Sequence, residues 1–126
     1  MTMSARLVFV ISALALFSLT KSAEKEPQGR YLATPLKGDY YVYGGTISEK
    51  LPPTAKDRKV SIMFSGQLAK DLFNQIGPDA KHACSAAAGY HERRKGDLVC
   101  ILDEGEYNCY FGLDVTTGKS TYGVIC

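Results

Sequence analysis

The feature that most restricts the fold is a short turn with one cysteine at the same distance on each side. The turn residues are Glu104 and Gly105, and the cysteines are Cys100 and Cys109. If the turn is a two-residue hairpin loop, the two cysteines face each other across the hairpin. Because side chains alternate along a strand, the same register places two more apolar pairs on that face: Leu102 with Tyr107, and Leu98 with Phe111. A slip of one residue would separate the two cysteines and would also break up the apolar face, so the pattern specifies this register.

A third strand is expected at residues 120–126, which would complete a C-terminal three-stranded meander. In this register Val115 pairs with Ser120, and residues 116–119 form a four-residue loop with Gly118 in a left-handed conformation. The apolar residues of this strand then join the same face as the two cysteines: Tyr122, Val124 and Cys126.

The same loop contains the letters Gly-Lys-Ser, which end a well-known phosphate-binding motif. That motif has four residues between its two glycines, followed directly by lysine. Here Gly112 and Gly118 have five residues between them. The spacing therefore argues against a nucleotide site, and we predict a hairpin turn at residues 116–119.

The predicted register also ranks the possible disulfides. Cys100 and Cys109 form a non-hydrogen-bonded pair, whose Cα atoms lie about 4.5 Å apart, within reach of a disulfide. Cys109 and Cys126 form a hydrogen-bonded pair, which is less suitable. We therefore favour Cys100 bonded to Cys109, and Cys84 bonded to Cys126. The alternative, Cys109 with Cys126 and Cys84 with Cys100, stays open because the argument depends on the turn length.

One amphipathic helix is expected at residues 66–76. Apolar side chains recur there at the spacing of one helix face: Leu68, Ala69, Leu72, Phe73 and Ile76. Ser65 can cap the start, and we expect Gly77 in a left-handed conformation, with Pro78 preventing continuation.

Two strands are expected before the helix, at residues 39–46 and 59–65, with a proline-containing loop at 48–58 between them. Together with the C-terminal strands, they predict a small single-domain α+β fold. In this fold the helix packs on an antiparallel sheet, and two disulfides staple the domain over residues 39–126.

Residues 1–22 have the pattern of a secretory signal peptide. Arg6 precedes an apolar run at residues 7–19, which is shorter than the ~20 residues of a membrane-spanning helix. Cleavage is expected after Ser22, with cleavage after Ala23 as an alternative. An uncleaved signal anchor is a further alternative. Four cysteines in an exported chain of this size favour two disulfides.

Cleavage would leave residues 23–38 as a flexible N-terminal arm and would make the chain neutral. The full chain has 15 Lys and Arg and 13 Asp and Glu. Arg6 and Lys21 leave with the signal peptide and no acid does, so the balance becomes 13 − 13 = 0. A neutral domain has no electrostatic attraction to nucleic acid or to anionic lipid. We therefore expect no nucleic acid partner and no stable membrane anchor after cleavage.

No metal, cofactor or reactive thiol is expected. The residues that could suggest a metal site, His82, Cys84 and His91, lack the closely spaced ligand pairs of zinc sites. If all four cysteines are oxidised, no thiolate remains to bind a metal or attack a substrate. No nucleophile motif of a hydrolase is present either. The chain is therefore not expected to be an enzyme.

Two groups of residues are candidates for a binding surface. The first is a set of tyrosines on one strand and on the sheet face opposite the core: Tyr40, Tyr41, Tyr43 and Tyr110. Exposed tyrosine gives a large contact area at low entropic cost. The alternative is that a second layer of the protein covers these rings.

The second group lies in the charged segment 90–97, namely His91, Arg93, Arg94 and Lys95. Guanidinium groups there could hold the carboxylates of an acidic partner. The alternative is a charged edge strand that discourages pairing with other sheets.

These observations predict an exported, periplasmic or secreted, non-enzymatic binding protein of the inhibitor, immunity or accessory type. Its partner would be another exported or envelope protein. One alternative is a small extracytoplasmic enzyme using His91 with Glu92 or Asp97. Another is a structural envelope protein with no discrete site.

Overall fold

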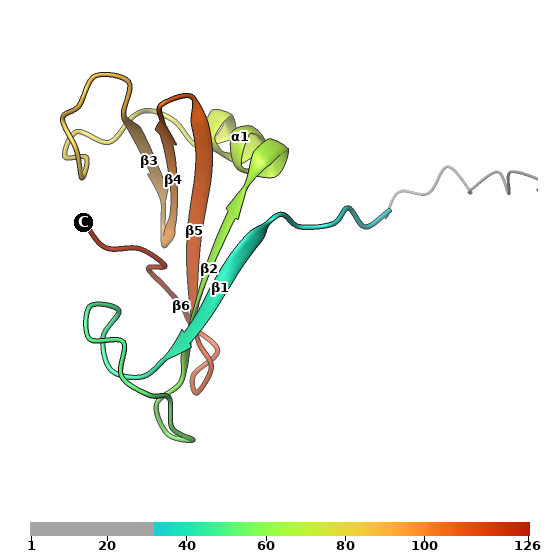
Figure 1. Ribbon diagram of the computed structural model, residues 1–126, viewed down its shortest axis with the longest axis vertical. Coiled ribbons are helices and arrows are strands. Elements are labelled where there is room, and N and C mark those ends of the chain that lie inside the picture. Colours follow the sequence, from blue (N-terminus) through green and yellow to red (C-terminus); the bar gives the residue numbers. More distant parts are fainter. Residues whose placement is uncertain (1–31) are drawn as a thin grey trace, which may run out of the picture. The chain divides into compact units, whose positions relative to one another are not determined.

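The computed structural model describes residues 32–126, which form an antiparallel sheet with one helix on one face (Figure 1). Along the sheet the strands are β1 (Gly38–Tyr43), β2 (Lys59–Ser65), β5 (Glu106–Asp114), β4 (Leu98–Asp103) and β3 (His91–Lys95). The short strand β6 (Ser120–Thr121) also pairs with β5, and helix α1 is Gly66–Gln75. The predicted α+β fold is confirmed. The expected signal peptide and residues 23–31 of the expected arm lie outside the described residues.

Strand β2 has the predicted bounds, and α1 starts where expected and ends one residue early. Ser65 occupies the N-cap position in an extended conformation, but its side chain makes no capping hydrogen bond. The left-handed cap expected at Gly77 is wrong, because Gly77 does not adopt a positive φ and the C-cap residue is Ile76. A residue before proline is biased towards extended conformations, which accounts for the difference at Gly77.

The hairpin of β4 and β5 has the predicted register. Cys100 lies opposite Cys109, and the turn consists of Glu104 and Gly105. Both turn residues have positive φ, 47° and 83°, as the favoured two-residue hairpin turn requires. The side chains of both cysteines are fully buried and form a disulfide. This half of the predicted disulfide pattern is confirmed.

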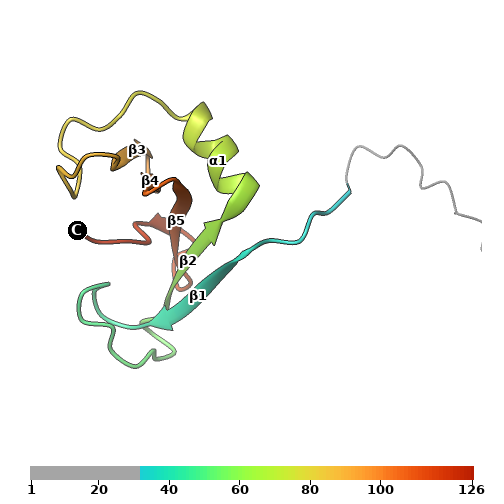
Figure 2. The same cartoon turned by 45° about the horizontal axis from the view of Figure 1, so that its top comes forward.

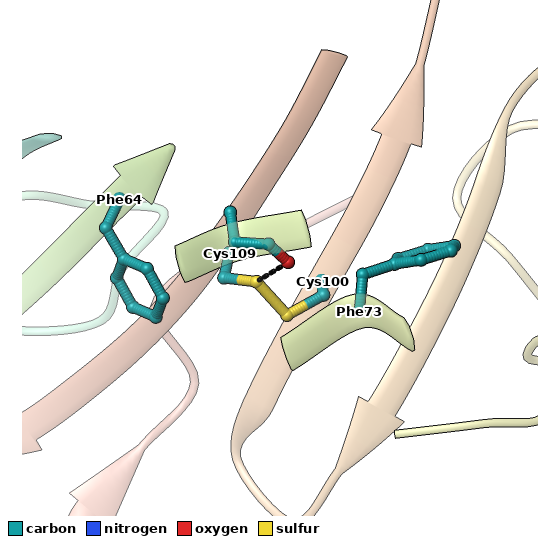
Figure 3. Packing of buried hydrophobic residues seen from close by; sticks show 5 residues of the cluster. Phe64, Phe73, Cys100 and Cys109 are labelled. Carbon is teal, nitrogen blue, oxygen red and sulfur yellow. Dashed lines mark hydrogen bonds between the residues drawn. A yellow bond between two sulfur atoms is a disulfide. The ribbon is translucent and has the colours of Figure 1, made fainter. Parts of the chain in front are cut away.

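The core lies between α1 and the sheet face that carries this disulfide. Figure 3 shows the disulfide beneath the helix, between Phe64 of β2 and Phe73 of α1. The Sγ atom of Cys109 lies 3.5 Å from the carbonyl oxygen of Ala69. The predicted apolar helix face therefore packs directly on the hairpin. We call this sheet surface the helix face and the opposite one the far face.

The C-terminal strand differs from the prediction in length and register. Strand β6 has two residues, and Ser120 pairs with Leu113 rather than with Val115. The predicted meander is also wrong in its order. Strand β2 occupies one side of β5, so β6 lies on the same side as β4, beside the other half of β5.

The turn before β6 is shifted by one residue from the prediction, to 115–118, and Asp114 organises it. The Asp114 N–H donates to the carbonyl of Lys119 at 2.8 Å, and the Asp114 carboxylate accepts hydrogen bonds from the N–H and hydroxyl of Thr116. Gly118 has a φ of 71°, the left-handed conformation that was expected. The Gly-Lys-Ser letters thus belong to a hairpin turn.

After β6 the chain leaves the sheet edge and crosses the far face. Ser61, on the far face of β2, donates a hydrogen bond from its hydroxyl to the carbonyl of Gly123. Cys126 then forms the second disulfide with Cys84, as predicted, and the alternative pairing is wrong. Figure 2 shows this C-terminal segment and α1 on opposite sides of β5.

Candidate functional site

The structure does not gather the predicted binding residues into one surface. Strands β1 and β3 form opposite edges of the sheet, and β5 lies between them. The alternation of side chains divides the residues further between the two faces. On the helix face are Tyr40, His91, Arg93 and Lys95; on the far face are Tyr41, Tyr43, Arg94 and Tyr110. Tyr43 is only 2% exposed, so it belongs to the interior.

Arg93 is engaged within the protein. Its Nε donates to Asp79 at 2.7 Å and another guanidinium nitrogen donates to the carbonyl of Phe73 at 3.0 Å. The guanidinium also lies 4.2 Å from the centre of the Phe73 ring. Hydrogen bonds from Arg93 and then His91 hold the pKa of Asp79 below its usual value. Arg93 therefore fastens the segment after α1 to strand β3.

Glu92 is a buried polar centre that sequence reasoning treated as part of an exposed charged segment. Its carboxylate accepts hydrogen bonds from the Cys84 N–H at 2.9 Å, the Tyr90 hydroxyl at 3.0 Å, and the Arg94 guanidinium. Burial acts to raise the pKa of Glu92, but these three donors outweigh it and the pKa is lowered. Burial, and then the hydrogen bond to Glu92, raise the pKa of Tyr90 to about 12.

Arg94 completes this centre on the far face. Besides Glu92, its guanidinium lies near both sulfur atoms of the disulfide between Cys84 and Cys126. Strand β3 is a charged edge strand, as the alternative interpretation of this segment had it. The strand alternation could have indicated that Glu92 and Arg94 share one face. The Cys126 sulfur near Arg94 is distant in sequence, and the Glu92 partners Cys84 and Tyr90 lie in an irregular segment without periodicity.

The residues of the hypothetical catalytic group lie apart from one another. His91 and Glu92 point to opposite faces of β3, and the Nδ1 atom of His91 lies 2.8 Å from Asp79. Asp97 accepts a hydrogen bond from the hydroxyl of Ser120 at 2.6 Å. The geometry therefore does not assemble His91 with Glu92 or with Asp97.

A groove of about 370 Å³ lies on the far face, and we call it the far-face groove. Its floor is formed by side chains of β1, β2 and β5, and its wall by the C-terminal segment. The floor residues are Tyr41, Met63 and Tyr110; the wall is residues 123–125; Asp39, Lys50 and Ser61 complete the lining. Two of the four predicted tyrosines thus meet here, whereas Met63 and the wall were not predicted. The sequence signal was misleading, because residues 120–126 were expected to join the sheet.

Two glycines set the position of the groove wall. A Cβ atom at Gly123 would lie 2.6 Å from the backbone nitrogen of Phe111, and one at Gly112 would lie 2.3 Å from the Thr121 hydroxyl oxygen. The C-terminal segment can therefore lie directly against the backbone of β5 only because both residues lack a side chain. The Ser61 hydrogen bond and the second disulfide hold the rest of the wall.

No family model, no curated protein and no solved structure matches this chain. The function must therefore be argued from the chemistry of the site.

The far-face groove combines an apolar surface with a polar rim. Burial, and then the neighbouring Tyr41, raise the pKa of Tyr110, so its hydroxyl stays protonated at neutral pH. The Lys50 ammonium lies 5.1 Å from the centre of the Tyr41 ring, where a cation is attracted to the aromatic face. Ile125 remains 48% exposed beside the groove. Such an arrangement can hold an apolar side chain and orient polar groups around it.

Two other findings concern residues 32–126 only. In this part of the chain, no group of three or more His, Cys, Asp or Glu side chains is placed to hold a metal ion. The helix found there is neither long nor apolar enough to span a membrane. A larger hollow of about 610 Å³ lies at the start of α1, but its lining is mixed, with Lys37, Lys70 and Glu106 beside Tyr107. We therefore place the candidate site at the far-face groove.

Proposed function

We propose that this chain is an exported, non-enzymatic binding protein that holds an apolar side chain of another exported or envelope protein in the far-face groove. The observation that carries the proposal is the open hollow of about 370 Å³ lined by Tyr41, Met63 and Tyr110. Aromatic side chains in such hollows provide much of the binding energy of protein interfaces. An inhibitor or accessory protein needs this kind of site and no catalytic group.

A protein partner fits the groove better than a free small molecule. The groove is open, and two of its lining residues, Tyr41 in the floor and Ile125 in the wall, are themselves exposed. Tyrosine has few rotatable bonds, so little conformational entropy is lost when a partner covers it. The wall is held by a disulfide and by backbone contacts, which also limits the entropic cost of binding.

The test compares two matched substitutions. Ile125 lies beside the groove, and Val115 lies in the turn after β5; they are 48% and 47% exposed. The full chain is expressed, and the exported protein is used to capture partners from envelope and culture-fluid extracts under non-reducing conditions. Mass spectrometry identifies what is retained. The unmodified protein and Val115→Lys should retain the same stoichiometric partner, and Ile125→Lys should lose it.

A third variant separates the two surfaces that the sequence suggested. Lys95 is exposed on the charged edge strand, so Lys95→Glu reverses a charge without disturbing Glu92. Loss of the partner in Lys95→Glu, with full retention in Ile125→Lys, would move the binding surface to β3. Absence of any stoichiometric partner in both extracts would contradict the proposal.

A further inference from the structure

The two edge strands of the sheet differ in charge and in whether other backbone groups cover their outer side. The outer side of β3 is covered, because the Ala80 N–H donates to the carbonyl of Glu92 at 2.7 Å, and the strand itself carries several charges. Strand β1 has one charged residue, Asp39, while Tyr40 is 72% exposed and Val42 is 36% exposed. An open, apolar edge strand of this kind is a template for pairing with another strand.

The hydrogen bonds around β1 identify which backbone groups face outward. The Lys37 carbonyl accepts from the Ser65 N–H, so the odd-numbered residues of β1 bond to β2. The outward residues are therefore Gly38, Tyr40 and Val42. The next outward residue, Gly44, exchanges two hydrogen bonds with Leu51, at 2.7 and 3.0 Å. Within the described residues, the unpaired edge thus ends at Val42.

We propose that this edge pairs with β1 of a second copy of the chain, antiparallel and about a two-fold axis. In one register every outward residue meets an outward residue: Gly38 lies opposite Val42, and Tyr40 lies opposite Tyr40 on the axis. This register joins the two sheets into one continuous sheet with both helices on the same face. An isologous contact of this kind is the commonest way in which identical chains associate.

Side chains on the helix face are complementary in this register. Gly38 leaves an apolar hollow of about 220 Å³, bordered by Leu36, Tyr40 and Ile62. Val42 of the second copy lies opposite Gly38 and on the same face, so its side chain points over this hollow. By symmetry the contact forms twice. A strand of unrelated sequence would match the hollow only by chance, which favours a second copy as the occupant.

Charges on the far face are also complementary. In the proposed register Asp39 lies opposite Tyr41 of the second copy. The Lys50 ammonium of each chain lies 5.1 Å from the centre of its own Tyr41 ring. Each carboxylate therefore approaches an ammonium of the other copy, and no like charges face each other across the ladder. Because Asp39 and Tyr41 also line the far-face groove, the dimer places the two grooves beside each other.

The first test measures association of the exported protein, after expression of the full chain, by sedimentation equilibrium over a range of concentrations. A monomer–dimer equilibrium is expected. Val42→Lys should weaken the dimer at least about tenfold, because it places a lysine at the open edge and over the apolar hollow. Val115→Lys and Ile125→Lys should leave it unchanged, which separates this interface from the partner site. A protein that stays monomeric throughout, or equal association of Val42→Lys, would overturn the proposal.

A second test reads the register. Tyr40→Cys should form an intermolecular disulfide under mild oxidation faster than Tyr41→Cys, because the axis places the two residue-40 Cα atoms about 5.5 Å apart, within the wider range of a disulfide. The reverse result would overturn the register. In hydrogen exchange, the amides of Tyr40 and Val42 should become protected as the concentration rises, and those of Asp39 and Tyr41 should be protected at all concentrations. Unchanged exchange at Tyr40 and Val42 would overturn the pairing itself.

Discussion

Among the described residues, Glu92 is a fully buried carboxylate that ties the loop before β3 to the strand. It receives hydrogen bonds from Cys84, Tyr90 and Arg94. Cys84 forms the disulfide to Cys126, and the Arg94 guanidinium lies beside it. The position of the C-terminal segment therefore depends on the carboxylate of Glu92 in the edge strand β3.

The substitution Glu92→Gln should lower the free energy of unfolding by about 3 kcal/mol, because it removes the charge that pairs with Arg94 and mismatches a buried acceptor. The expected loss is at the low end for buried pairs, since Arg94 retains access to water. Urea unfolding measures it. Glu106→Gln, at the exposed first position of β5, is the control and should change stability little. Equal effects of the two would refute the role of Glu92.

The stabilisation by Glu92 should also depend on pH. The pKa of Glu92 is lowered in the folded protein, so its contribution is complete above the usual glutamate pKa of about 4.3 and is lost as pH falls through the lower folded value. The stability difference between the unmodified protein and Glu92→Gln should therefore be constant near neutral pH and shrink in acid. Unfolding measured from neutral pH down to about pH 3 tests this. A difference that grew in acid would show that the sign is wrong.

At the scale of elements, the hairpin of β4 and β5 could be predicted because two requirements agree on one register. The turn at Glu104 and Gly105 and the facing cysteines each specify it. Strand β6 could not be predicted in the same way, since Asp114 shifts its turn by one residue through side-chain hydrogen bonds. The side of β5 on which β6 pairs depends on β2, which is distant in sequence.

The candidate site was harder to predict for a related reason. Tyr41 was predicted from residue type, and Tyr110 also from its place on the sheet face opposite the core. The groove between them needs a C-terminal segment that leaves the sheet. The burial of Glu92 needs Cys84 and Tyr90 brought over the far face. The groove depends on contacts between distant segments, and the burial of Glu92 depends on the path of the irregular loop before β3. No local periodicity reports either.

Replacing both Cys100 and Cys109 with alanine should lower the free energy of unfolding by about 3 kcal/mol on the chain-entropy account. The bond closes a short loop, with a sequence separation of 9, and its sulfur atoms also fill the core beneath α1. Thermal and urea unfolding measure the loss. Because the far-face groove does not include these residues, the variant should still capture the partner while it is folded. Loss of capture by folded protein would contradict this separation.

At the scale of the whole molecule, the second disulfide should matter more for both stability and binding. It joins Cys84 to Cys126 across a sequence separation of 42, so replacing both with serine should lower the free energy of unfolding by about 4 kcal/mol. It also releases the end of the groove wall. We therefore expect folded protein of this variant to lose the partner. Retention of the partner at full affinity would show that the wall does not form part of the site.

Binding should depend little on salt. After the expected cleavage the positive and negative side chains balance, 13 − 13 = 0, and the groove floor is largely apolar, so Coulomb attraction contributes little to the complex. The dissociation constant measured from about 50 to 500 mM salt should therefore change by less than about threefold. A steep rise with salt would instead favour the charged edge strand as the contact surface.

The contacts that hold the C-terminal segment in place determine which residues of the groove wall can be substituted. Gly112, Gly123 and Ser61 fix the path of the wall through backbone contacts and one hydrogen bond. Val124 and Ile125 take no part in that fixing and face the groove. We therefore expect that substitutions at Val124 and Ile125 leave the path of the wall unchanged. A groove that binds a partner as proposed would therefore gain new specificity through two positions, without a new fold.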